Sequence, residues 1–148
     1  PATAAVQAMR QSEVHLKTYE PYLEFVARLQ AIKDKICHFI SEERANGKTV
    51  YVYGASTRGN TLLQYFGLDS SLLVAAAERN SAKFGKKMVG TNVPIISEEE
   101  ARAAKPDYML VLPWAFIDEF VKRETKFFED GGKFIVPLPD FRLIGSEG

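Results

Sequence analysis

The chain of 148 residues is 46% hydrophobic and 26% charged, which is ordinary for one globular domain with a core of its own. Its 19 basic and 19 acidic residues cancel to a formal charge of zero, so there is no electrostatic reason to expect nucleic acid or an anionic membrane surface as a partner. The single cysteine, Cys37, excludes an internal disulfide and fits a reducing compartment, and no apolar run reaches the length of a membrane span. We therefore expect a cytoplasmic domain, whose oligomeric state the sequence leaves open.

Two helical segments are expected at the start of the chain. Residues 1–20 form a helical lead-in with a weak apolar stripe, and they begin without a methionine, as in a fragment of a longer protein. Apolar residues then recur at three- and four-residue spacing over 21–46, which predicts a long amphipathic helix. The expected main domain covers 21–140, and 141–148 is expected to be a tail.

Strands and helices are expected to alternate after the long helix. This alternation predicts a Rossmann-like α/β fold, in which a mostly parallel, doubly wound sheet of five strands has the order 3-2-1-4-5. The long N-terminal helix should pack against this sheet. The expected strands are 49–53, 72–77, 93–96, 107–112 and 133–136, and the expected helices after the first strand are 59–66, 98–104 and 117–128.

A glycine-containing turn joins the first expected strand to its helix. Backbone N–H groups at a helix N-terminus, together with the positive end of the helix dipole, bind anions. The turn also carries two hydroxyls and a guanidinium, so it predicts a phosphate-bearing ligand; alternatively, its glycines only permit a sharp bend. The candidate binding residues of this turn are Gly54, Ser56, Thr57, Arg58, Gly59 and Asn60.

The same turn differs from a dinucleotide-binding fingerprint at its centre. The fingerprint requires Gly-x-Gly-x-x-Gly, whereas Ser56 places a side chain where a pyrophosphate would approach the backbone. Glu78 lies near the place of the fingerprint's acidic residue, about 20 residues further on. We therefore keep Glu78 as a candidate ligand-binding residue and an NAD-linked oxidoreductase half-domain as a distant alternative.

Two further segments are expected to reach the turn 54–60. Ligands of such sheets bind beyond the carboxyl ends of the strands, where the winding direction switches, here between the first and fourth strands. The turn 113–116 should therefore face the turn 54–60, which makes Trp114 a candidate wall for stacking a ring. Lys83, in the loop after the second strand, either closes over a phosphate or faces solvent.

No set of catalytic residues is visible in the sequence. The chain lacks a glycine-rich S-adenosylmethionine motif, a Walker lysine and a His/Asp pair near a serine or cysteine. His15 and His38 lie on separate expected helices without other ligands at metal-binding spacing. We expect neither a catalytic residue nor a metal ligand in this chain.

Six motifs, taken together and in order, resemble a known family over residues 19–139. They are similar to the C-terminal domain of bacterial sugar C-methyltransferases, which are S-adenosylmethionine-dependent enzymes that methylate nucleotide-linked keto-deoxysugars. The motifs are YGASTRGNTLLQY (53–65), ERN (78–80), GTNVPI (90–95), KPDY (105–108), VLPW (111–114) and GG (131–132).

The resemblance implies that this chain is one domain of a longer enzyme, whose other domains hold the methyl donor and the catalytic residues. In this family a zinc-binding segment and a methyl-donor domain precede a Rossmann-like domain that helps to hold the nucleotide sugar. S-adenosylmethionine, zinc and the acid–base histidine and tyrosine would then all lie upstream of Pro1, and the partners of this chain would be a nucleotide-sugar phosphate and the upstream domains. Ala115 stands where the family often has histidine. The alternative is a non-catalytic interaction domain that docks through the helix 21–46.

Overall fold

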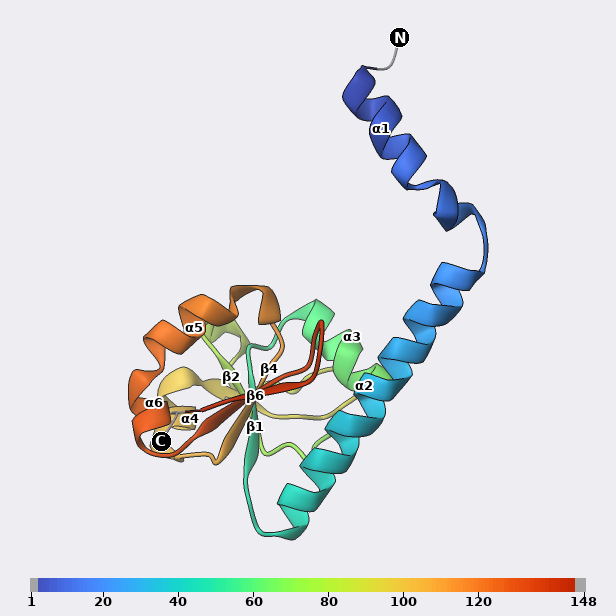
Figure 1. The fold of residues 1–148 in the computed structure, drawn as a ribbon. Helices are drawn as coiled ribbons and strands as arrows, with labels where there is room; N and C mark the ends of the chain where they lie inside the picture. The colour runs from blue at the N-terminus through green and yellow to red at the C-terminus, as the bar shows by residue number, and fades with distance from the viewer. Residues whose placement is uncertain (1–2, 146–148) are drawn as a thin grey trace.

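The structure, a computed structural model, describes residues 3–145 and has three layers. Figure 1 shows the sheet edge-on, with α2 and α3 on one face and α4, α5 and α6 on the other. The helices are α1 (Ala4–Ser12), α2 (Glu20–Ala45), α3 (Thr57–Phe66), α4 (Glu98–Ala103), α5 (Ile117–Arg123) and α6 (Thr125–Glu129). The strands are β1 (Val50–Tyr53), β2 (Ala76–Glu78), β3 (Ile95–Ser97), β4 (Tyr108–Val111), β5 (Lys133–Val136) and β6 (Arg142–Ile144).

The sheet has the order β3-β2-β1-β4-β5-β6, and its first five strands are parallel. The predicted order 3-2-1-4-5 is therefore confirmed, with β4 beside β1 and Val52 level with Leu110. The prediction of five strands was wrong by one, because β6 pairs antiparallel with β5 at the edge of the sheet. The run that forms β6 is short and mostly exposed, so it lacks the apolar pattern of a buried strand. Residues 146–148 of the expected tail lie outside the described residues.

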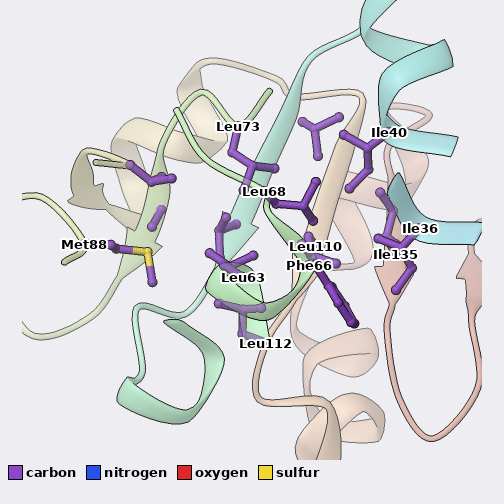
Figure 2. Packing of buried hydrophobic residues seen from close by; sticks show 14 of the residues in the cluster. Ile36, Ile40, Leu63, Phe66, Leu68, Leu73, Met88, Leu110, Leu112 and Ile135 are labelled. Atoms are coloured by element: carbon purple, nitrogen blue, oxygen red, sulfur yellow. The ribbon is translucent and has the colours of Figure 1, made fainter. Parts of the chain in front are cut away.

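Each face of the sheet carries its own hydrophobic core. Side chains alternate along a strand, so Leu110 of β4 faces α2 and α3 whereas Met109 faces the layer of α4 and α6. Figure 2 shows Ile36 and Ile40 of α2 together with Leu110 and Ile135 in the first core. All four side chains are fully buried. Because Met109 is also buried on the opposite face, β4 is covered on both sides, which explains its continuous apolar run.

The structure shifts two of the expected helix boundaries. Helix α3 begins at Thr57, two residues earlier than expected, because Ser56 is its N-cap. The single helix expected over 117–128 is two helices, which meet at Glu124 with backbone angles φ −101° and ψ 33°. The capping box of α4 forms as the sequence suggests, with Ser97 and Glu100 bonded reciprocally.

The first part of the chain extends away from the three layers (Figure 1). Helix α1 has no buried residue, and the first buried residue of α2 is Ile32. Among the described residues, no helix combines the length and the apolar character that crossing a bilayer requires.

Candidate functional site

The carboxyl ends of β1 and β4 meet at a crevice, which lies where the strand order switches. Gly54 follows β1 with a φ of 89°, and a Cβ atom there would lie 2.9 Å from Cγ of Pro113. Only glycine combines this backbone conformation with so close an approach. The turns 54–60 and 113–116 therefore face each other as predicted, and a cavity of about 360 Å³ opens between them and β2.

The N-terminus of α3 presents backbone donors to this crevice. Ser56 Oγ accepts a hydrogen bond of 3.0 Å from the Gly59 N–H, and the Ser56 carbonyl accepts from Asn60. The N–H groups of Thr57 and Arg58 have no acceptor within residues 3–145. These two donors and the dipole of a ten-residue helix favour a negatively charged group beside them.

Arg58 and Trp114 line a second, adjacent hollow of about 310 Å³. Arg58 is exposed and forms no ion pair with any part of the chain that the structure describes. Trp114 is half-buried at the start of a 3₁₀ turn, Trp114–Phe116. Ser56, Pro113 and Phe116 line both hollows, so the two lie directly side by side. The structure brings Arg58 and Trp114 together and places Glu78 and Lys83 in the other hollow.

Glu78 and Lys83 form an ion pair that ties the loop after β2 to the glycine turn. Lys83 Nζ lies 2.8 Å from Glu78 Oε2 and donates to the Ala55 carbonyl at 2.9 Å. Burial would raise the pKa of Glu78, but hydrogen bonds from Lys83 and from two backbone N–H groups outweigh it and hold that pKa below its usual range. Lys83 is thus largely neutralised by its own chain, which leaves less of its charge for a ligand.

Two residues of the predicted site have evident packing roles. The Asn60 side chain donates to the Val89 carbonyl at 2.9 Å and accepts from the Thr91 hydroxyl, which fastens the loop before β3 to α3. At Gly59, a Cβ atom would lie 2.5 Å from Leu112 Cβ, so glycine is needed for α3 to pack on the end of β4. Of the turn residues, Ser56, Thr57 and Arg58 direct hydrogen-bonding groups toward solvent or the crevice.

The sequence reasoning missed two arginines that line the larger cavity, Arg79 and Arg123. Arg123 donates to Glu98 at 2.9 Å and contacts the Tyr53 hydroxyl, so it forms a wall of the cavity. Arg79 is exposed and has no ion pair among the described residues. Arg79 could have been noticed in the ERN motif, whereas no spacing in the sequence joins Arg123 to Tyr53.

Behind Arg123 lies a buried carboxylate, Glu124, which is 2% exposed. It accepts hydrogen bonds from the Tyr53 hydroxyl at 2.8 Å and from Arg102 at 2.6 and 2.9 Å. Burial would raise the pKa of Glu124, but the bonds from Arg102 and Tyr53 keep it below its usual value. Burial raises the pKa of Tyr53, so its hydroxyl stays protonated and donates. Within residues 3–145, no three His, Cys, Asp or Glu side chains are grouped to hold a metal.

Comparison with known proteins gives two findings. The family described as the C-methyltransferase C-terminal domain matches residues 1–139. The C-methyltransferase NovU of Streptomyces niveus is 36% identical over 147 residues, which are 99% of this chain and 35% of that protein. The chain thus spans about a third of the length of this curated relative.

Proposed function

This chain belongs to the family of C-methyltransferase C-terminal domains, and on that premise we propose that it holds the nucleotide-sugar substrate of an S-adenosylmethionine-dependent enzyme. The substrate class is a keto-deoxysugar linked to a nucleoside diphosphate. The observation that carries the proposal is the N-terminus of α3, where two N–H groups without an acceptor in the described part of the chain lie with the exposed Arg58 at the switch point of the sheet. The diphosphate is assigned to this place.

We assign different parts of the ligand to the two hollows. The indole of Trp114 lies beside Arg58, where it offers an apolar face to a ring attached to the diphosphate. The larger cavity has Glu78 and Arg123 in its walls, which supply an acceptor and donors for sugar hydroxyls. These assignments follow from the chemistry of the side chains and from their positions on either side of the α3 N-terminus.

The methyl donor and the catalytic groups belong to other parts of the enzyme in this proposal. S-adenosylmethionine carries a positively charged sulfonium, and the exposed guanidinium groups of Arg58 and Arg79 disfavour a cation in the crevice. We assign S-adenosylmethionine, zinc and the acid–base residues to the upstream domains. A reducing, cytoplasmic location fits the lone thiol of Cys37.

The substitution Arg58→Ala tests the proposal. Loss of a charge-assisted hydrogen bond to phosphate should weaken nucleotide-sugar binding by about 1.5–3 kcal/mol, measured by titration calorimetry on the methyltransferase that contains this domain. The melting temperature should not change, because Arg58 is exposed. Arg10→Ala, on α1, removes a similar side chain outside the crevice and should leave affinity unchanged. Unchanged affinity with a lower melting temperature in Arg58→Ala would show that Arg58 is structural.

A further inference from the structure

Helix α2 carries one apolar stripe, of which only the second half is covered. With 100° between successive residues, Phe25, Ile32 and Ile36 lie on the same side of the helix. Ile32 and Ile36 are 9% and 0% exposed, whereas Tyr22, Phe25 and Val26 are 53%, 53% and 55% exposed. We name the uncovered part, Tyr22, Phe25, Val26 and Leu29, the open stripe. Leu29 is half-buried at the edge of the covered part, and the Tyr22 hydroxyl donates to the Leu16 carbonyl at 3.0 Å; the rings of Tyr22 and Phe25 and the Val26 side chain are otherwise exposed within residues 3–145.

The open stripe continues into a groove that lies next to the crevice. The groove has a volume of about 350 Å³; α2 forms one side, and Trp114 and Leu138 lie on the other. Its lining is apolar except for Arg28. Trp114 also lines the hollow that contains Arg58, so the groove and the candidate phosphate site share one side chain. A protein domain bound to the open stripe would therefore lie next to the proposed diphosphate site at Arg58.

We propose that the open stripe and this groove form the docking surface for the methyl-donor domain of the same enzyme, an inference that rests on the proposed function. The C-methyltransferase relative is nearly three times as long as this chain, so a large part of such an enzyme lies outside it. The donor must reach the acceptor sugar in the crevice, and because the groove shares Trp114 with the hollow that contains Arg58, a domain seated in the groove would lie beside that crevice. Charged Glu24 and Arg28 lie on the same stretch of α2 and supply the polar rim that such interfaces have.

Hydroxyl-radical footprinting of the isolated chain and of the parent methyltransferase tests this surface directly. Side chains that dock should react at least fivefold more slowly in the parent enzyme, and we expect this for Tyr22 and Phe25. Leu23 is 67% exposed and lies about 160° around the helix from Phe25, so it should react equally in both proteins. Equal reactivity of Tyr22 and Phe25 in the two proteins would overturn the inference. Protection that appears in the isolated chain with increasing concentration, alongside a doubled mass in sedimentation, would also overturn it and would identify a second copy as the occupant.

A pair of variants of the parent enzyme separates docking from substrate binding. Phe25→Asp should restore the reactivity of Tyr22 and reduce methyl transfer at least tenfold, whereas the matched Leu23→Asp should do neither. Neither variant should change affinity for ADP, GDP, UDP or thymidine diphosphate, whichever of them binds. If Phe25→Asp changes neither methyl transfer nor the reactivity of Tyr22 while a diphosphate still binds, the proposed docking surface is wrong and the substrate assignment stands. If no diphosphate binds while Tyr22 and Phe25 remain protected, the substrate assignment fails and the surface stands.

Discussion

At Gly59, a missing side chain determines how closely α3 approaches β4. The substitution Gly59→Ala would place Cβ 2.5 Å from Cβ and 2.6 Å from Cδ1 of Leu112, which is buried. Alanine normally favours a helix over glycine by about 1 kcal/mol. Here overpacking should reverse the sign and lower the free energy of unfolding by about 1–3 kcal/mol, as measured by urea denaturation. Thr61→Ala, on an exposed position of α3, is the control, with an expected change within about 0.5 kcal/mol. A more stable Gly59→Ala protein would contradict the packing seen here.

The buried Glu124 leads to a prediction about pH. Glu124→Gln removes the charge that Tyr53 and Arg102 satisfy, and it should lower the free energy of unfolding by about 2–3 kcal/mol near neutral pH. The folded-state pKa lies below the ordinary value of 4.5. The carboxylate therefore stabilises the fold fully above about pH 4.5, and this contribution is lost as the pH falls through the folded-state pKa.

Denaturation of both proteins across this pH range checks the prediction. The difference in stability between the wild type and Glu124→Gln should be largest at neutral pH and should shrink in acid. Glu119→Gln changes an exposed carboxylate on α5 and should show little difference at any pH. A difference that is constant with pH would mean that the charge of Glu124 is not what stabilises the cluster.

At the scale of the element, the start of α3 combines a structural role, the N-cap at Ser56, with the binding role that we propose. Ser56→Ala removes the acceptor for the Gly59 N–H and should cost about 1 kcal/mol of stability. Ser56→Asp keeps an oxygen that can cap the helix and adds a negative charge at the positive end of its dipole, so stability should be retained. That same charge lies where the diphosphate is proposed to bind, so affinity should fall about tenfold or more.

Thermal denaturation and calorimetry of the two variants separate the roles. The wild type and Ser56→Asp should have similar melting temperatures, and that of Ser56→Ala should be lower. Nucleotide-sugar affinity, in contrast, should be lowest for Ser56→Asp. If Ser56→Asp binds a nucleotide sugar as well as the wild type does, the anion does not lie at the α3 N-terminus.

At the scale of the whole molecule, the crevice should distinguish an anionic ligand from a cationic one. We predict that the isolated chain neither binds S-adenosylmethionine nor transfers methyl groups, because the exposed Arg58 and Arg79 disfavour a sulfonium. It should bind a nucleoside diphosphate weakly, since in our proposal the other wall of the cleft belongs to the upstream domains. Thermal-shift titration of this chain with both ligands measures this. Saturable stabilisation by S-adenosylmethionine would overturn the assignment of the domain to the sugar-nucleotide side.

The sequence by itself determined the parallel sheet, its order and the place of the glycine turn. The run 107–112 is apolar at almost every position, and so short a run is typical of a strand covered on both faces. Right-handed crossovers then leave few orders for alternating strands and helices. The turn 54–60 was recognisable because glycines between a strand and a helix mark a sharp bend. These signals are local, so they can be read without knowing the rest of the fold.

Only the tertiary structure decided the sixth strand, the break at Glu124 and the division of the site into two hollows. The bond between Tyr53 and Glu124 joins residues 71 positions apart, and the pair of Glu78 and Lys83 is anchored on Ala55 from another element. Strand β6 exists because β5 offers it a partner edge. The energies of these contacts depend on which groups are buried together, and burial is a property of the folded chain that residue spacing does not contain.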